Sequence, residues 1–165
     1  MITLAETEAK MSALARNLDR AVDEVFTTML GMQCGPSSDA WTGEEGAQRS
    51  AISAVIGLAG ALSGSLVLDS SGLAARSMAG QMTGIEPEEV DAVVRDAIGE
   101  VANMVAGAWK GYDPELSSGC LLSTPTVVAG ASYELFGQRA PMRIERSYRG
   151  EAMRFRVTIF CEWPG

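Results

Sequence analysis

Two residues near the middle of the chain are of types that can carry out chemistry together. Glu100 and Asn103 place a carboxylate and a carboxamide three positions apart, in the segment GEVANMVAG at 99–107. The other residues of this segment are apolar or glycine. In a helix, side chains three positions apart lie on one face about one turn apart, so the two polar groups can act on a single bound group.

The chain has no histidine, and this narrows the chemistry open to it. Histidine general acid or base catalysis, Ser-His and Cys-His nucleophile pairs, and metal sites that contain histidine are excluded. Cys34, Cys120 and Cys161 lie far apart and show no CxxC spacing. We therefore expect reduced core cysteines, rather than a disulfide framework or structural zinc, and no cofactor belonging to the chain itself.

Length and charge point to a single acidic domain. The 165 residues fit one domain over 1–165, and the 47% of hydrophobic residues are enough for an ordinary core. A net charge of −8 and a pI near 4.5 argue against binding to nucleic acid or to an anionic membrane surface. The N-terminal MITLAETEAK has no apolar core of a signal peptide, so we expect a cytoplasmic protein.

The segment 51–70 raises the alternative of a membrane span, because it is uncharged up to Asp69. Glycine and serine interrupt it, and its hydrophobicity is modest. We interpret it as two antiparallel strands, at about 51–59 and 61–69.

The remaining pattern predicts an α+β fold in which long helices pack on one face of an antiparallel or mixed sheet. Hydrophobic spacing predicts a helix over 5–31, and the polar segment 34–50 is a loop or an edge hairpin. A short helix at 70–84, a long helix from Pro87 to Gly111, and strands within 124–132, 141–149 and 152–163 complete the expected elements.

The long helix separates into two faces when it is turned by 100° per residue. One face is apolar and must pack on the sheet, and the other is a polar stripe flanked by Val93 and Met104. The apolar face consists of Val90, Val94, Ile98, Val101, Val105 and Trp109, and the polar stripe of Glu89, Asp96, Glu100, Asn103 and Gly107.

A solvated helix surface is the plain interpretation of such a stripe, but three features favour a contact surface. Asparagine is a poor choice inside a helix. Gly107 lies on the stripe, where alanine is more stable by about 0.5–1 kcal/mol. The stripe also has little of the lysine and arginine that usually make a helix exterior soluble.

The spacing Asp96-x3-Glu100-x2-Asn103, followed after 21 intervening residues by Pro125, resembles the signature of the CheC/CheX/FliY phosphatases. These proteins remove phosphate from the response regulator CheY in chemotaxis, a two-component signalling pathway. The segments IGEVANMVAG, STPTVVAG and IGLAGALSGSLVL are also similar to stretches of CheX. The expected order of elements matches too, so the resemblance covers nearly the whole chain.

The resemblance implies a hydrolase with a CheX-like fold that docks its long helix on a CheY-like receiver domain. Asn103 would orient a water for in-line attack on the phospho-aspartate, and Glu100 would pair with the receiver's active-site lysine. The receiver would supply its own Mg²⁺. Positioning and electrostatics dominate phosphoryl transfer, which fits a site without histidine. The resemblance also implies a symmetric homodimer.

Four further residues are expected to contact the partner. Asp96 would support the helix or its docking, Gly107 lies on the stripe, and Met104 borders it. Pro125 would shape the start of the following strand, although a simple strand-edge proline fits as well.

Other interpretations stay open at this point. CheC-type and FliY-type members usually carry two such helices, but the first helix here offers Asp19, Asp23 and Glu24 without a matching amide. This favours the single-site CheX-like branch. The main alternative is a non-catalytic binding module for a phosphorylated receiver, like a flagellar-switch adaptor, and the next is a structural dimer.

The loop at 34–50 holds the remaining candidates. Its carboxylates Asp39, Glu44 and Glu45 fit an exposed turn better than a catalytic cluster. Trp41 would cover a core edge or a dimer contact.

Overall fold

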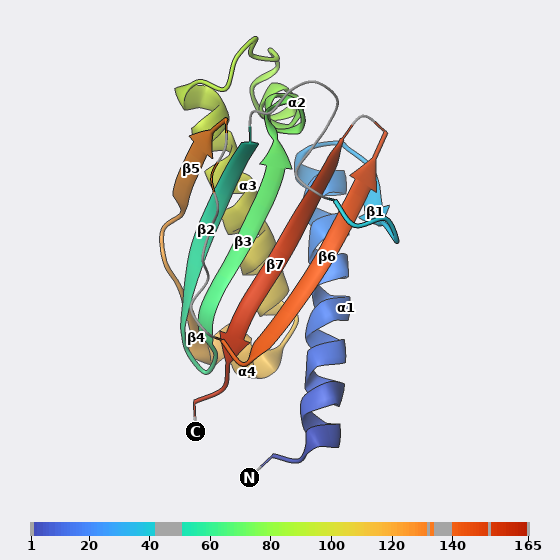
Figure 1. Cartoon of the computed structure of the whole chain (residues 1–165), viewed down its shortest axis with the longest axis vertical. Helices are drawn as coiled ribbons and strands as arrows, with labels where there is room; N and C mark the ends of the chain where they lie inside the picture. Colours follow the sequence, from blue (N-terminus) through green and yellow to red (C-terminus); the bar gives the residue numbers. More distant parts are fainter. Residues whose placement is uncertain (1, 42–50, 132, 134–139, 152, 165) are drawn as a thin grey trace.

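The computed structural model describes residues 2–41, 51–131, 133, 140–151 and 153–164. Within these residues, α-helices and β-strands account for most of the chain (Figure 1). In chain order the elements are α1 (Leu4–Met29), β1 (Cys34–Pro36), β2 (Ala51–Gly60), β3 (Ser63–Ser71), α2 (Gly72–Thr83), α3 (Ala92–Gly111), α4 (Pro114–Gly119), β4 (Cys120–Leu122), β5 (Thr126–Gly130), β6 (Met142–Gly150) and β7 (Arg154–Glu162).

The strands form one antiparallel sheet in the order β1-β6-β7-β3-β2-β4, and β5 also pairs with β2. Figure 1 shows α1 and α3 running along the same face of this sheet, with α2 across one end. The core lies between that face and the helices. The α+β class and the placement of the helices are therefore as predicted, and the sheet is antiparallel.

Alternation along β7 shows how the sequence produces the core. Phe155, Val157 and Ile159 point to the helices and are fully buried, as expected for every second residue of a strand with one covered face. The ring of Phe155 stacks on Phe26 of α1, with centroids 4.7 Å apart. Burying such side chains is the main term that stabilises the contact between sheet and helices.

Local signals set most of the element ends. Thr3 and Glu6 form a capping box at the start of α1. Ser71 caps α2, whose end is marked by Gly84 at φ 85°.

The segment 51–70 forms the paired strands β2 and β3, as predicted. No helix in the described part of the chain is long and apolar enough to cross a membrane.

The prediction for the start of the long helix was wrong. The helix begins at Ala92 instead of Pro87, because the Asp91 side chain caps it by accepting a hydrogen bond from Val94 N at 3.0 Å. Glu89 and Val90 therefore lie outside the helix.

Two short elements, α4 and β4, were not predicted, and β1 is an edge strand within the segment 34–50 that was expected to be a loop or an edge hairpin. The segment 114–119 forms α4, with Asp113 as its cap and Pro114 in its first turn. Strand β4 follows it directly, and β1 pairs with the end of β6.

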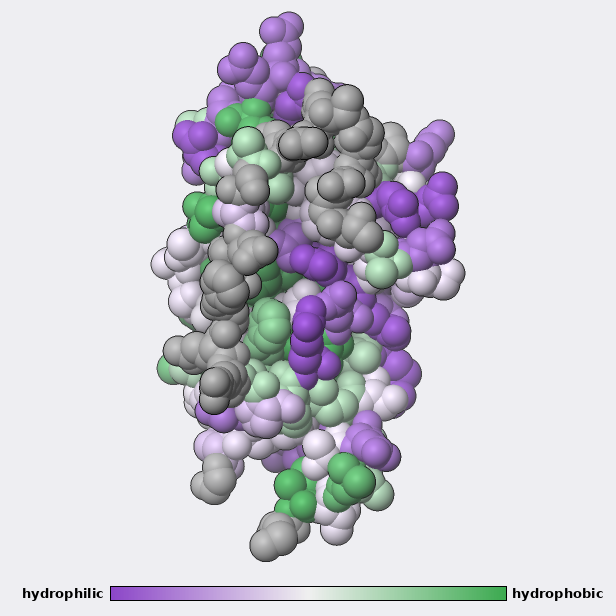
Figure 2. Space-filling view, in the orientation of Figure 1, coloured by the Kyte–Doolittle hydropathy of each residue, from purple (hydrophilic) through white to green (hydrophobic). Residues whose placement is uncertain are grey.

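The sheet face away from the helices is the one seen in Figure 2, where hydrophobic residues gather over its middle. Trp41 is buried against this face; its backbone N–H donates to Ser147 Oγ at 3.0 Å, and Arg156 lies 5.6 Å from its ring centroid. Arg156 also pairs with Asp69 at 3.1 Å. Trp41 thus covers part of this sheet face, over β6 and β7. Glu44 and Glu45 lie outside the described residues, and Asp39 is exposed.

Candidate functional site

Helix α3 is held in place by the face opposite its polar stripe. Small residues let it lie close to its neighbours, and the Trp109 indole donates a hydrogen bond to the carbonyl of Leu14 in α1 at 3.1 Å. This bond satisfies a polar group that burial would otherwise leave unpaired. The buried residues of α3 are Val94, Ala97, Ile98, Gly99, Val101, Ala102, Val105, Ala106 and Trp109.

Glu100 and Asn103 lie on the side of α3 that faces away from this core, as their spacing predicts. Glu100 is exposed and Asn103 is half-buried. Neither side chain makes a hydrogen bond or an ion pair with another described residue. A carboxylate and an amide one turn apart thus keep their full hydrogen-bonding capacity, so they can engage a group from outside the chain.

The neighbouring candidates differ in their burial. Asp96 lies one turn before Glu100 and is exposed, whereas Met104 is half-buried and packs on the core. Gly107 is exposed, and a β-carbon added there would meet no atom within 4 Å. The chain's own packing therefore does not require glycine at position 107.

Pro125 comes close to the same stripe from another part of the chain. It is exposed and lies between β4 and β5, at the sheet edge next to α3. A β-carbon on the buried Gly99 would lie 3.3 Å from Pro125 Cγ. Sequence reasoning did not single out Gly99, although a glycine inside a helix directly before Glu100 was a visible signal.

In α1, the acidic residue Asp19 is bound within the chain, unlike Glu100 of α3. Asp19 accepts hydrogen bonds from the Tyr148 hydroxyl at 2.8 Å and from Arg146 at 2.9 Å, both on β6. Burial, and then the bond to Asp19, raise the pKa of Tyr148 well above its usual range. Asp23 and Glu24 are exposed. Asp19 is thus committed to the fold.

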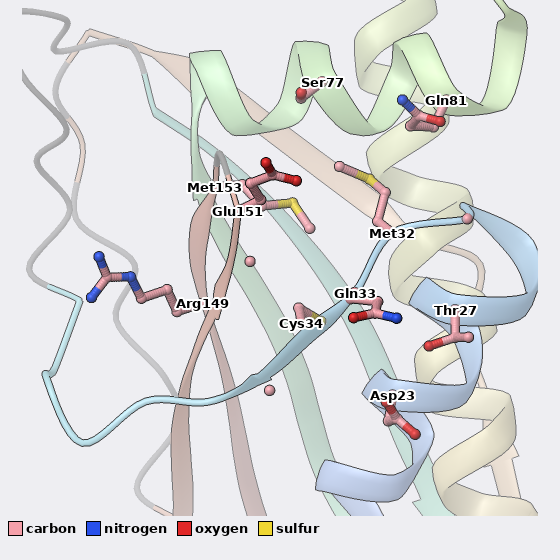
Figure 3. Close-up of a pocket in the computed structure, with 13 residues that line it drawn as sticks. Asp23, Thr27, Met32, Gln33, Cys34, Ser77, Gln81, Arg149, Glu151 and Met153 are labelled. Carbon is pink, nitrogen blue, oxygen red and sulfur yellow. The ribbon is translucent and has the colours of Figure 1, made fainter.

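A cleft of about 1000 Å³ lies on another part of the molecule, between α1, β1, α2 and the β6–β7 turn (Figure 3). Glu100 and Asn103 do not line it. Its polar lining includes Asp23, Gln33, Gln81 and Glu151. The candidate pair therefore lies away from this cleft, on the outer side of α3, and an exposed helix side suits a protein partner better than a small substrate.

The cysteines offer no nucleophile near this surface. All three are free thiols, as expected. Burial, and then the charge of Asp23, raise the pKa of Cys34 to about 12, so its thiolate is scarce at neutral pH. Among the described residues, no group of three cysteine, aspartate or glutamate side chains is placed to hold a metal ion.

Comparison with known proteins decides the family. The sequence model of the family described as chemotaxis phosphatase CheX matches residues 52–145, which is more than half of the chain. The chain belongs to the CheX family. The match includes α3 and Pro125. No curated protein matches the chain.

Solved structures of CheX and of a putative chemotaxis protein have the same fold. A chemotaxis protein CheX from Desulfovibrio desulfuricans is 23% identical with a TM-score of 0.75, covering 91% of this chain and 99% of that one. A putative chemotaxis protein from Desulfovibrio vulgaris Hildenborough is 24% identical with a TM-score of 0.76, covering 91% and 97%. The CheX–CheY–BeF3–Mg²⁺ complex from Borrelia burgdorferi is 18% identical with a TM-score of 0.70, covering 89% and 96%.

Proposed function

We propose that this protein is a cytoplasmic phosphatase that removes the phosphoryl group from the phospho-aspartate of a CheY-like receiver domain. The observation that carries the proposal is the pair of Glu100 and Asn103, one turn apart on the outer side of α3 and without partners among the described residues. Membership in the CheX family supports the reaction class.

In the proposed reaction, α3 enters the receiver beside its phosphorylated aspartate. The Asn103 carboxamide holds a water in line with the bond that breaks between phosphorus and the aspartate oxygen. An amide suits this task because phosphoryl transfer depends on positioning and charge stabilisation more than on a strong base. The water's oxygen bonds to phosphorus as the bond to the aspartate oxygen breaks, both of the water's protons stay with the phosphate formed, and the aspartate is released as a carboxylate.

Glu100 has the proposed task of pairing with the receiver's lysine. Its carboxylate is exposed and unpaired within the described chain, so it can form a charge-assisted hydrogen bond with that ammonium group. Such a bond sets the register of α3 in the partner's site and brings Asn103 to the phosphoryl group. The receiver brings the Mg²⁺ that neutralises its phosphate.

A receiver domain as the partner is supported by one relative of the same fold. The Borrelia burgdorferi structure contains CheX together with CheY, BeF3 and Mg²⁺. Glu100 and Asn103 do not line the cleft in Figure 3, so the proposal has the partner supply the pocket in which the reaction takes place. We propose CheY as the first receiver to test, because the family description names chemotaxis.

Asp96, Met104, Gly107 and Pro125 make up the rest of the proposed contact surface. Gly107 gives the strongest indication of a contact surface, because a β-carbon added there would meet no atom within 4 Å. A receiver backbone can approach α3 closely there. A Gly107→Leu variant should then bind the receiver more weakly while its unfolding temperature stays close to that of the wild type.

We also propose that the protein forms a homodimer. β1 pairs only with Tyr148–Gly150 of β6, and Ser37 N donates to Ser147 O at 2.8 Å. The outer edge of β6 from Met142 to Arg146 is thus unpaired within the described chain, and such an edge can add a strand from a second copy. Light scattering measures the mass directly, and a monomer at all concentrations would rule the dimer out.

The function is tested by phosphorylating purified receivers with acetyl phosphate and following the loss of phosphate with and without this protein. Faster decay is expected with at least one receiver, in proportion to the amount of protein added. Tight binding to a phosphorylated receiver without faster decay would favour the adaptor alternative. No binding and no acceleration with any receiver would leave a structural role.

A further inference from the structure

The contact between Gly99 and Pro125 joins the helix that carries the candidate pair to the edge of the sheet. A β-carbon on Gly99 would lie 3.3 Å from Pro125 Cγ, 3.5 Å from Pro125 Cβ and 3.4 Å from Val127 Cγ2. These distances are at the tight end of normal contacts. The helix backbone itself therefore forms the surface on which the proline packs, and glycine is the residue that permits this approach.

The other glycines of α3 near its C-terminal end are not used in this way. A β-carbon on Gly107 or Gly111 would meet nothing within 4 Å, whereas Gly99 is buried. A glycine inside a helix is unfavourable relative to alanine. Among these three glycines, only Gly99 has a packing contact that offsets this disadvantage.

Pro125 is held against the helix by an irregularity in the edge of the sheet. β2 pairs with β4 through residues 58–60 and with β5 through residues 51–55. Between these pairings, the edge chain has one residue more than β2, which makes residues 123–125 a bulge. Pro125 has no N–H, so it cannot donate to a ladder, and a bulge at an edge is where proline fits.

The bulge is fixed to β2 through Ser123. Ser123 N donates to Gly57 O at 2.9 Å, and Gly57 N donates to Ser123 Oγ at 2.7 Å. A β-carbon on Gly57 would lie 3.2 Å from that hydroxyl oxygen. The 123–125 bulge thus has a close glycine contact on each side, Gly57 in the sheet and Gly99 in the helix, and its position relative to α3 is well defined.

The helical repeat places this contact directly beside the candidate pair. Asn103 is four residues after Gly99, which is about 40° around the helix and about 6 Å along its axis. Glu100 is the next residue after Gly99. Ser123, Thr124 and Pro125 are exposed, so a partner that reaches Asn103 also meets the bulge.

We propose that Gly99 and Pro125 form a positioning contact, which sets how far Asn103 stands from the 123–125 bulge on which the partner rests. The inference rests on the proposed function, because the distance matters for a receiver that touches both surfaces. A side chain at position 99 moves the helix away from the bulge by a few tenths of an ångström. The amide then holds its water off the line of attack.

The first test uses the free protein and does not depend on activity. The side-chain amide resonances of Asn103 are assigned by NMR in the wild type, Gly99→Ala, Gly111→Ala and the double variant Gly99→Ala/Pro125→Ala. We expect Gly99→Ala to shift them and Gly111→Ala to leave them unchanged. The double variant should return them toward the wild type, because it removes Pro125 Cγ, the atom nearest to the new methyl group.

The second test measures dephosphorylation of the receiver that the wild type acts on. Gly99→Ala should lower kcat about tenfold, since misplacements of this kind are costly, and KM should change less than twofold. Gly111→Ala should match the wild type in both constants. Pro125→Ala is also measured alone. The double variant should lose less activity than the product of the losses in Gly99→Ala and Pro125→Ala, which is the mark of a direct coupling.

Each result decides a separate point. Unchanged Asn103 resonances in Gly99→Ala, or a wild-type kcat in that variant, would overturn the positioning role. So would losses that multiply in the double variant, or a loss of kcat that is matched by a lower unfolding temperature. If the wild type accelerates no receiver, the proposed function fails, whereas the NMR comparison still decides whether the contact places Asn103.

Discussion

Helices α1 and α3 lie side by side on the same face of the sheet (Figure 1), and each carries an acidic residue near its middle. In α1, Asp19 is bound by Tyr148 and Arg146 of the sheet. In α3, Glu100 faces away from the sheet and has no partner among the described residues. The carboxylate of α1 thus stabilises the fold, whereas the carboxylate of α3 is available to bind another molecule.

The comparison shows why the two helices cannot exchange roles. Tyr148 is almost fully buried, and its hydroxyl requires the acceptor that Asp19 provides. Removing Asp19 leaves a buried donor unpaired, whereas removing Glu100 leaves no polar group of the described chain without a partner. Removing the Asp19 carboxylate should therefore lower the stability of the protein, and removing the Glu100 carboxylate should lower its activity.

The largest effect is expected from Asn103→Ala. The rate of receiver dephosphorylation should fall on the order of 10²-fold, which is about 2.7 kcal/mol of barrier, because the water loses its orienting amide. Stopped-flow or gel assays of phosphate loss measure it. The matched control is Asn17→Ala, which removes a half-buried amide from α1 and should leave the rate unchanged. Equal losses in both variants would contradict the assignment of the site to α3.

Glu100→Gln should act next most strongly, mainly on binding. The neutral side chain cannot form the charge-assisted bond with the receiver's lysine, so the Kd for a receiver activated with beryllofluoride should rise about tenfold, or about 1.4 kcal/mol. Isothermal titration calorimetry measures this affinity. Glu24→Gln changes an exposed glutamate of α1 in the same way and should bind like the wild type. An unaltered Kd for Glu100→Gln would remove the proposed ion pair.

Asp19→Ala should have the opposite pattern. The free energy of unfolding should fall by about 1–3 kcal/mol because the buried Tyr148 hydroxyl loses its acceptor, while the dephosphorylation rate of the folded protein stays unchanged. The pair with Arg146 adds less, since that side chain is 41% exposed. Urea unfolding measures the loss. Adding Tyr148→Phe should recover part of it, and no recovery would show that another contact is responsible.

The smallest effect concerns alkaline pH on the α1 side of the molecule. Burial, and then Asp23 of α1, raise the pKa of Cys34 to about 12 from its ordinary 9.0. The unfolded chain releases this proton near pH 9 while the folded chain keeps it, so stability should fall as the pH rises from 9 toward 12.

Cys161 contributes in the same direction, because burial raises its pKa to about 11. Urea unfolding midpoints at pH 7, 9 and 10.5 should therefore decline less steeply in Cys34→Ser than in the wild type. Parallel declines in the two proteins would mean that the Cys34 thiol does not titrate on unfolding.

Much of the fold follows from patterns that neighbouring residues create. Alternation in β7, helical spacing in α1 and α3, and the caps at Ser71 and Gly84 are local, and the elements they predict are present. The error at the start of α3 was also local. Pro87 and Asp91 both carry start signals, and the side chain that bonds to the backbone N–H of Val94 is the one that begins the helix.

The sequence by itself determined that Glu100 and Asn103 share one side of a helix, because a repeat of 3.6 residues per turn needs no knowledge of the rest of the chain. The tertiary structure decided which contacts form between residues that are far apart in the sequence. Asp19 accepts a hydrogen bond from Tyr148, which is 129 positions away in the sequence. Trp41 bonds to Ser147, which is 106 positions away. Gly99 contacts Pro125 only because β5 lies beside α3 in the fold. Such contacts depend on the order of strands in the sheet, and no local hydrogen bond or spacing encodes that order.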